Sequence, residues 1–244
     1  MTSQIAQTLS VLLGGLSLLG FSAVLLAGPF ELVPLGLGPE AALAWDAGLC
    51  LAFFAQHSGM ARRTFRAWLG RAVPAHLHPA VYSIASGVVL LLLVGLWQHT
   101  HIVLFSLEGP ERLALRAVFV AAVALSVWSV RALGALDLFG LGAIRDHRVG
   151  HATPELPFAV RGPYRWVRHP LYGLLIVMTW TSPDVTADRA LFGVLFTGWI
   201  LLGIAFEERD LVRELGDPYR EYQREVPMLV PWRVPAEPKN GGVR

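Results

Sequence analysis

The polar residues best suited to chemistry form one short run, Arg161–Tyr172, and a pair of carboxylates, Glu207 and Glu208, ends a later apolar stretch. The run combines arginines, tyrosines and a histidine with a proline that favours the first turn of a helix. The free N–H groups of a helix start bind carboxylates or phosphates, while carboxylates and aromatic faces bind cations. The two segments predict a site for a charged small molecule at a membrane surface.

Within this run, Pro170 suits the first helical turn, which puts His169 at or beside the N-cap. The backbone N–H groups of Leu171, Tyr172 and Gly173 are then expected to be free. Two ordinary roles compete with this interpretation. Arginine, tyrosine and tryptophan are common anchors at a membrane boundary, and Glu207 or Glu208 can pair with Arg209 or Arg213 along one helix.

The composition assigns the chain to the membrane. Of its 244 residues, 54% are hydrophobic and 16% are charged, and the mean hydropathy is +0.51. A spanning helix needs roughly 20 apolar residues, and Ile5–Phe30 exceeds this without one ionisable group. A signal peptide is the alternative for this segment, but no Lys or Arg precedes it and the apolar run is too long. We therefore predict a retained first span.

Further apolar stretches predict an all-α, polytopic helical bundle with five to six transmembrane segments. They are Ala41–Phe54, Pro79–Gln98, Leu113–Val130, Leu171–Ser182 and Ala190–Phe206. The last two predict a C-terminal helical hairpin, although the first of that pair is short for a span. We predict a single domain, 1–244, with a four-span part (1–130), a catalytic part (131–234) and a disordered tail (235–244).

Basic residues indicate the orientation, because they gather in the short cytoplasmic loops of membrane proteins. They follow the second and fourth predicted spans, at Arg62, Arg63, Arg66, Arg71, Arg131, Arg145, Arg148, Arg161, Arg165 and Arg168. The sequence thus predicts a bacterial inner-membrane protein whose site faces the cytoplasm. This asymmetry also explains the pI near 9.0, so we expect no nucleic-acid partner.

The polar residues resemble the motif of the membrane methyltransferases grouped with isoprenylcysteine carboxyl methyltransferase and phospholipid N-methyltransferase. That pattern runs G-x-Y-x-x-x-R-H-P-x-Y, an apolar hairpin, E-E, Y-x-x-Y and V-P. It is matched by Gly162, Tyr164, Arg168, His169, Pro170, Tyr172, Glu207, Glu208, Tyr219, Tyr222, Val226 and Pro227. The resemblance implies S-adenosylmethionine as cofactor, bound without a Rossmann domain.

A closer resemblance, to bacterial methanethiol S-methyltransferases, covers nearly the whole chain. It rests on Gln56-His57-Ser58, Met60-Ala61-Arg62, Asp137–Leu141, Glu207–Val212 and Val226–Leu229. The resemblance implies an enzyme that methylates a small or lipophilic thiol, making dimethyl sulfide from methanethiol. Methylation of a prenylcysteine carboxylate or a lipid head group stays open as an alternative.

The expected roles follow from this resemblance and from the charges. Residues expected to bind the cofactor are Gly162, Tyr164, Arg168, His169, Pro170, Leu171, Tyr172, Glu207 and Glu208. Those expected to contact the acceptor are Gln56, His57, Tyr219 and Tyr222. Catalytic candidates, for taking the thiol proton or stabilising the thiolate, are His169, Glu208, Arg213 and His57.

Other functions remain possible from the sequence. His57 is also suited to a haem-binding membrane protein or isomerase, and the whole chain to a purely structural membrane protein. One cysteine, Cys50, builds no thiolate metal site. His147 and His151 have helical spacing, but the glycine between them weakens a metal site, so no metal is predicted. The expected partners are the thiol substrate and the bilayer, with no protein partner implied.

Overall fold

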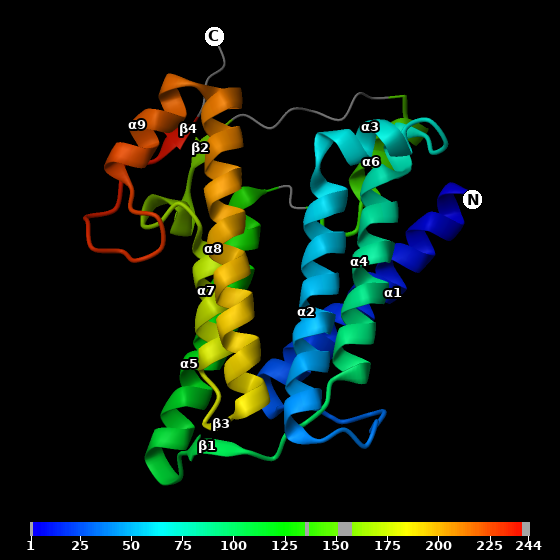
Figure 1. Ribbon diagram of the computed structural model, residues 1–244. Coiled ribbons are helices and arrows are strands. Elements are labelled where there is room, and N and C mark those ends of the chain that lie inside the picture. The colour runs from blue at the N-terminus through cyan, green and yellow to red at the C-terminus, as the bar shows by residue number, and fades with distance from the viewer. Residues whose placement is uncertain (1, 135–136, 151–157, 241–244) are drawn as a thin grey trace. The chain divides into compact units, whose positions relative to one another are not determined.

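The computed structural model describes residues 2–134, 137–150 and 158–240, and it is 71% helical with 4% strand (Figure 1). The chain forms two compact units. The first contains α1 (Ser3–Ala27), α2 (Pro39–Ala61), α3 (Arg63–Leu69), η1 (Ala75–Leu77), α4 (His78–Leu96), β1 (Val103–Ser106), α6 (Leu141–Arg148) and β3 (Asp184–Thr186). The second contains α5 (Gly109–Leu133), β2 (Ala159–Val160), η2 (Gly162–Arg165), α7 (Pro170–Trp180), α9 (Asp217–Glu225) and β4 (Lys239–Asn240). Helix α8 (Ala187–Leu215) begins in the first unit and enters the second at Phe196.

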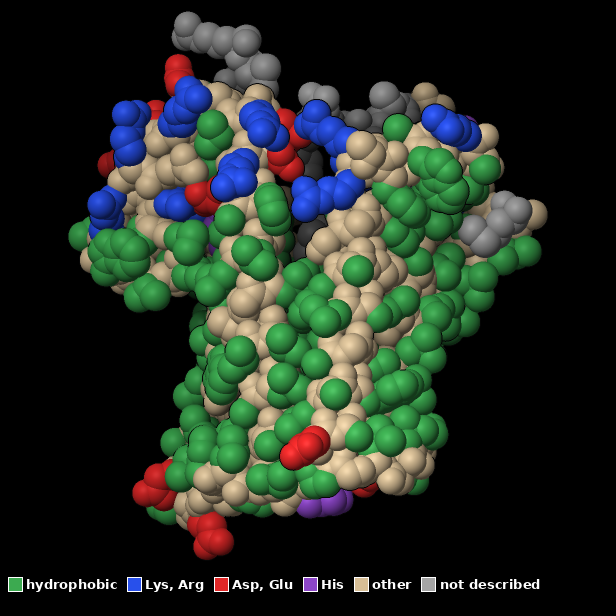
Figure 2. All heavy atoms as spheres, viewed as in Figure 1, with side chains coloured by type: hydrophobic (Ala, Val, Ile, Leu, Met, Phe, Trp, Pro, Cys, Tyr) green, Lys and Arg blue, Asp and Glu red, His purple; other side chains and the backbone are tan. Residues whose placement is uncertain are grey.

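The helices confirm the predicted polytopic membrane bundle. Among the described residues, four helical segments are long and apolar enough to cross a bilayer: Ser3–Ala27, Ala75–Leu96, Gly109–Leu133 and Ala187–Leu215. Figure 2 shows hydrophobic side chains covering much of the surface of the long helices. Helix α2, with 23 residues, is long enough at about 1.5 Å per residue, but it carries Glu40 and a buried Asp46. Helix α7, with 11 residues, is too short to span alone.

In the first unit, α4 packs against both α1 and α2. The buried face of α1 consists mostly of small residues at helical spacing: Ala6, Ser10, Gly14, Ser17, Phe21 and Leu25. Small residues let two membrane helices approach closely. The approach is tight, since a Cβ added at Gly87 of α4 would lie 2.8 Å from the Leu13 backbone.

Two buried carboxylates fasten the loop after α4 to its neighbours. Asp188, in the first turn of α8, accepts hydrogen bonds from Trp97 Nε1 (3.1 Å) and Thr100 Oγ1 (2.8 Å). Asp46 accepts one from the Gln98 backbone N–H (2.9 Å). Beside this loop, β1 and β3 pair antiparallel with one irregularity in register. The partners make these acids structural parts of the first unit.

In the second unit, α7 and η2 pack against α5. Helix α5 therefore belongs with the segment that carries the Arg161–Tyr172 motif. Gly162 makes this packing possible. Its φ is +52°, and an added Cβ would lie 2.8 Å from Ala132 Cβ on α5. The two compact units do not follow the predicted boundary at residue 130 between a four-span part and a catalytic part. The assignment of a single functional domain stays a prediction.

The disorder predicted for 235–244 stays a prediction, although part of this tail makes hydrogen bonds to the motif segment. The backbone of β4 (Lys239–Asn240) pairs antiparallel with β2 (Ala159–Val160). The Ala236 N–H donates to the Arg165 carbonyl, and Arg165 Nε donates to the Ala236 carbonyl (2.9 and 2.6 Å). Backbone and side-chain bonds thus connect part of this segment to Arg165 and β2. Residues 241–244 lie outside the described residues.

We predict that Gly140→Ala destabilises the first unit, because an added Cβ would lie 2.6 Å from the Pro79 carbonyl carbon at a residue whose φ is +69°. The expected loss is about 3 kcal/mol, the sum of overpacking and left-handed strain. Gly150→Ala is the matched control, since its φ is +70° but nothing lies within 4 Å of an added Cβ. Thermal unfolding in detergent measures both. Equal losses in the two variants would contradict the close contact.

Candidate functional site

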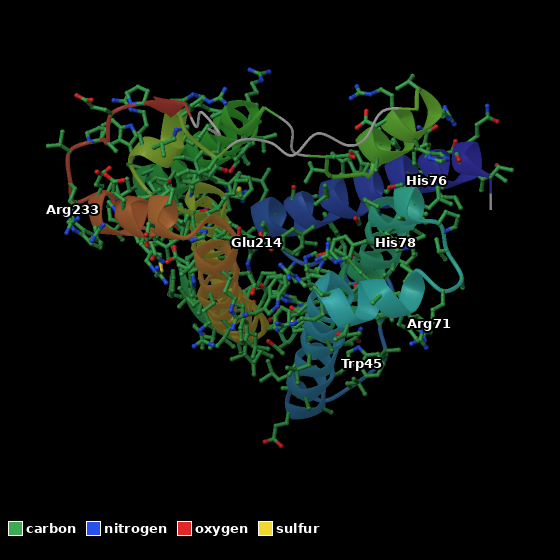
Figure 3. The ribbon with its side chains drawn as sticks, turned by 90° about the horizontal axis from the view of Figure 1, so that it is seen from above. Trp45, Arg71, His76, His78, Glu214 and Arg233 are labelled. Carbon is green, nitrogen blue, oxygen red and sulfur yellow. The ribbon has the colours of Figure 1, made fainter. Side chains whose placement is uncertain are left out.

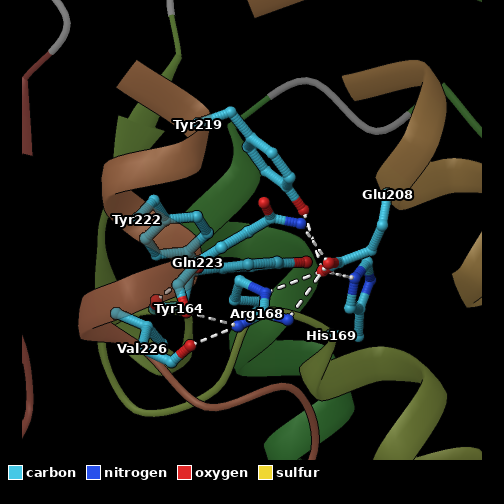
Figure 4. Close-up of polar contacts among 8 residues, drawn as sticks. All are labelled: Tyr164, Arg168, His169, Glu208, Tyr219, Tyr222, Gln223 and Val226. Carbon is cyan, nitrogen blue, oxygen red and sulfur yellow. Dashed lines mark hydrogen bonds and ion pairs between the residues drawn. The ribbon is translucent and has the colours of Figure 1, made fainter. Parts of the chain in front are cut away.

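The Glu208 carboxylate is the centre of the polar site in the second unit (Figure 4). Arg168 binds it with two parallel hydrogen bonds, from Nε to Oε1 at 2.7 Å and from Nη2 to Oε2 at 3.1 Å. The side chains of Arg168 and Glu208 are only 10% and 14% exposed. A bidentate arginine pair is the strongest common arrangement for an ionised carboxylate. Each charge therefore has its counter-ion in this largely buried position.

Three further donors complete the shell of Glu208. His169 Nε2 lies 2.8 Å from Oε1, the Tyr219 hydroxyl donates to Oε1 at 3.1 Å, and Gln223 Nε2 donates to Oε2. An ionised carboxylate only accepts hydrogen bonds. The bond to His169 thus requires the proton on Nε2 of that ring, which fixes the tautomer of a neutral His169.

Backbone groups hold the other side of Arg168. Its Nη1 donates to the carbonyls of Val226 and Gln223. The backbone N–H groups of Arg168 and His169 donate to the carbonyls of Pro227 (2.9 Å) and Met228 (3.1 Å). The Val226–Met228 segment therefore lies against the motif. All three guanidinium nitrogens of Arg168 are engaged within the protein.

The local fold explains why these residues meet. Helix α7 begins at Pro170 with His169 as its N-cap residue, which confirms the predicted helix start. The expectation that Gly173 has a free N–H is wrong, because that group donates to the His169 carbonyl at 3.0 Å. The first helical hydrogen bond closes there, so only the residues before Gly173 keep N–H groups outside the helical pattern.

The tyrosines join the site to a small apolar core. Tyr219 and Tyr222 are buried on α9 and pack edge to face with Phe158. The Tyr222 hydroxyl donates to the Tyr164 carbonyl at 2.6 Å. Burial raises the pKa of Tyr222, and burial together with the charge of Glu208 raises that of Tyr219. Both hydroxyls stay protonated and donate hydrogen bonds.

The charge of Glu207 acts on the Tyr164 hydroxyl. Burial, followed by the charge of Glu207, raises the pKa of the Tyr164 hydroxyl to about 12. The Glu207 carboxylate has a different surrounding from its neighbour Glu208, because no arginine pairs with it among the described ion pairs. Glu207 and Tyr164 are thus the polar side chains here that Arg168 leaves available.

The competing interpretation, a pairing along α8, does not hold for Glu208, whose arginine partner is Arg168 rather than Arg209 or Arg213. Arg213 instead pairs with Asp210 at 3.2 Å, and its side chain is 76% exposed. An exposed pair of this kind contributes little to stability. The structure therefore brings Arg168, His169 and Glu208 together and leaves Arg213 outside their hydrogen-bonded network.

A second polar cluster lies within the first unit, between α2 and α4. The Tyr82 hydroxyl lies 2.7 Å from His57 Nε2, and Ser86 Oγ lies 3.2 Å from His57 Nδ1. Gln56 Nε2 donates to Ser86 Oγ at 3.3 Å and to the Met60 sulfur at 3.1 Å. Gln56 Oε1 is buried and has no hydrogen-bond partner. The cluster surrounds the predicted acceptor residues Gln56 and His57 with partners from α4.

Other histidines form no metal centre in the part of the chain that is described. Across those residues no group of three or more His, Cys, Asp or Glu side chains has a geometry that holds a metal ion. His76 stacks on His147 with ring centroids 3.7 Å apart, and Figure 3 shows His76 and His78 near the start of α4. His151 lies outside the described residues.

Comparison with known proteins identifies the family. A methanethiol S-methyltransferase of Mycobacterium tuberculosis is 40% identical over 181 residues, which are 74% of this chain and 74% of the relative. One of Pseudomonas sp. is 39% identical over 225 residues, 91% of this chain and 84% of the relative. This chain belongs to the methanethiol S-methyltransferase family. Nurim of Rattus norvegicus is also similar, at 29% identity over 70% of the chain and 68% of the relative.

Two further comparisons found no match. No protein-family model matches the chain, and no solved structure does.

Within this methyltransferase fold, several contact residues escaped the sequence analysis. Gln223 donates a hydrogen bond to the Glu208 carboxylate, but a neutral glutamine gives no charge pattern in the sequence that predicts this contact. Tyr82 and Ser86 contact His57 from the next long helix. The i, i+4 spacing of Tyr82 and Ser86 places them on one helix face, which is the one signal that was available.

We predict that Glu208→Gln destabilises the methyltransferase strongly, because it leaves the Arg168 charge without a counter-ion in a poorly solvated position. The expected loss is about 3 kcal/mol, measured as a lower thermal midpoint in detergent. Glu207→Gln is the matched control, with an expected change within about 0.5 kcal/mol. Adding Arg168→Gln to Glu208→Gln should recover part of the loss. Equal effects of the two glutamate substitutions would refute the special position of Glu208.

Proposed function

We propose that the chain transfers a methyl group from S-adenosylmethionine to a small thiol, methanethiol, and thereby makes dimethyl sulfide. The observation that carries this proposal is the identity of about two residues in five to methanethiol S-methyltransferases over most of the chain. The motif residues gathered around Glu208 supply a polar site consistent with a charged donor. S-adenosylmethionine supplies a methyl group already activated on a positively charged sulfur.

The chemistry of the available groups fits this cofactor. We assign the methionyl carboxylate to the first turn of α7, where Leu171 presents its backbone N–H group at the positive end of the helix dipole. Glu207 is assigned to the ammonium group or to a ribose hydroxyl. The neutral phenol of Tyr164 is suited to pack against the adenosine. These groups complement a ligand that carries both a carboxylate and cations.

Arg168 and Glu208 take a different part in the proposal. The Arg168 guanidinium and the Glu208 carboxylate already pair with each other, so neither offers an unpaired charge to a ligand. We assign them, with His169, Tyr219 and Tyr222, to holding the helix start of α7 beside α8 and α9. Gly162 and Pro170 shape the same segment. A fixed site matters because methyl transfer needs donor carbon, acceptor sulfur and leaving sulfur in line.

His57 is the strongest candidate for taking the proton of the thiol. In the transfer, the S–H bond gives its electrons to sulfur, a new S–C bond forms and the old C–S bond breaks. Glu208 accepts five hydrogen bonds and is a poor base. The Nε2 proton of His169 is bound to Glu208, and Arg213 is exposed and paired. The His57 ring instead contacts two neutral hydroxyls, those of Tyr82 and Ser86.

We place the site at the cytoplasmic face of a bacterial inner membrane. Within the first unit, basic side chains follow the end of α2 and continue into the segment after α3, at Arg62, Arg63, Arg66 and Arg71. Figure 3 labels Arg71 in this segment. The positive-inside rule supports a cytoplasmic position for this end. An apolar thiol can reach such a site from the bilayer.

The test is an assay of membranes that contain the protein, supplied with S-adenosylmethionine and methanethiol. We predict that dimethyl sulfide accumulates, and that Glu207→Gln weakens S-adenosylhomocysteine binding about tenfold by removing the charge assigned to the ammonium group. Calorimetry of detergent-purified protein measures the binding. Methylation of a prenylcysteine or a lipid in place of methanethiol would identify a different acceptor. A Soret band without S-adenosylhomocysteine binding would favour the haem protein.

We predict that His57→Gln lowers the rate constant for methanethiol methylation by about a hundredfold, the usual size of a lost general base. Binding of S-adenosylhomocysteine should be unchanged. His101→Asn is the matched control, because His101 is an exposed histidine of the first unit and asparagine tolerates its φ of 56°. If His57→Gln methylates methanethiol at an unchanged rate across the pH range, His57 is not the base of the reaction.

A further inference from the structure

An exposed apolar loop in the second unit has no place in the proposed reaction. It follows α9 and comprises Leu229–Val234, named here the apolar hook. Three of its side chains are large, hydrophobic and strongly exposed: Val230 is 61% exposed, Trp232 67% and Val234 88%. Figure 1 shows the loop after α9, and Figure 2 shows hydrophobic side chains over it. Such a cluster marks an interaction surface.

The hook is held at both ends by the same motif segment. Before it, the Met228 carbonyl accepts the His169 N–H (3.1 Å), and after it the Ala236 N–H donates to the Arg165 carbonyl (2.9 Å). Arg233 adds a third tie, since its Nη1 donates to the Arg224 carbonyl at the end of α9. The exposed side chains therefore project from a loop whose ends are fixed.

The expected depth of the hook in the membrane follows from the hydrogen bonds that connect it to Glu208. The Met228 carbonyl binds His169, and the His169 ring binds Glu208. Directly before Glu208, α8 exposes large apolar side chains at Leu202 (62%) and Phe206 (43%). After Glu208, α8 continues to Leu215 with charged residues, over about 10 Å. The hook thus begins where the surface of α8 changes from apolar to charged, which is the expected level of the membrane interface.

The composition of the hook fits that level. Tryptophan is enriched at membrane interfaces, where its ring lies among the lipid head groups. Valine and proline beside it favour the upper acyl region. Figure 3 shows Arg233 at the outer side of α9, a position from which a guanidinium can reach lipid phosphates. Charged residues of α9 are exposed, and Arg220 pairs with Asp217.

We propose that the apolar hook inserts into the lipid bilayer at the interface and that its partner is the phospholipid surface itself. The inserted loop joins the membrane to the segment Arg165–His169, to which both its ends are bonded. Insertion depends only on the described structure of the second unit and on the chain being a membrane protein. It does not rest on the proposed thiol methylation.

The experiment measures the depth of single nitroxide labels in protein reconstituted into phosphatidylcholine nanodiscs. Cys50 is the one cysteine of the chain and is buried, so Cys50→Ala gives a background free of other thiols. Labels are introduced by Val230→Cys and Trp232→Cys. Leu202→Cys is the lipid-facing control and Glu221→Cys, on the exposed side of α9, the aqueous control. Accessibility to oxygen and to a water-soluble nickel chelate is compared at each site.

We predict that labels at 230 and 232 show an oxygen-to-nickel accessibility ratio close to that at 202 and well above that at 221. A ratio equal to that at 221 would show that the hook lies in water and would overturn the proposal. Low accessibility to both reagents would show that protein covers the hook, and would overturn it as well. An unchanged thermal midpoint of each labelled variant verifies that the fold is retained.

Discussion

The ion pair between Arg168 and Glu208 is the interaction on which the second unit depends. It joins the loop before α7 to α8, and the same carboxylate binds Tyr219 and Gln223 on α9. Four sequence segments meet there when the Val226–Met228 segment is included. A buried charge pair is retained only if its hydrogen bonds are nearly complete, because desolvation costs several kcal/mol for each ion. The five bonds to Glu208 meet this condition.

The membrane imposes the second constraint. Helices in lipid gain little from hydrophobic burial against one another, so close packing and buried polar contacts determine their association. The first unit shows both devices, in the small-residue face of α1 and in the hydrogen bonds of Asp188. The second unit uses Gly162 for close packing against α5. The buried charge of Asp188 lies in the first turn of α8, where the loop after α4 supplies its hydrogen-bond donors.

Sequence reasoning predicted the membrane bundle, the helix start at Pro170 and the family. Apolar runs and proline positions are local signals, and a bilayer makes them reliable. Pairings between distant segments were harder to predict. Glu208 has Arg213 five residues further along the same helix, and charge alone did not distinguish Arg213 from Arg168. Gln223 carried no charge, and part of the tail makes backbone bonds to Arg165 and β2, which composition does not reveal.

The saturation of Arg168 changes how the family motif is best interpreted. A motif residue that binds a charged ligand must have a free charge or hydrogen-bonding group, and Arg168 has its guanidinium nitrogens engaged. The motif therefore contains two kinds of residue. Arg168, His169, Glu208 and Tyr219 build a hydrogen-bonded frame, whereas Tyr164, Glu207 and Leu171 are the residues to which we assign recognition. Because the frame is bonded to Met228, the residue directly before the apolar hook, insertion of the hook links the position of the bilayer surface to the position of the helix start through a single short segment of backbone.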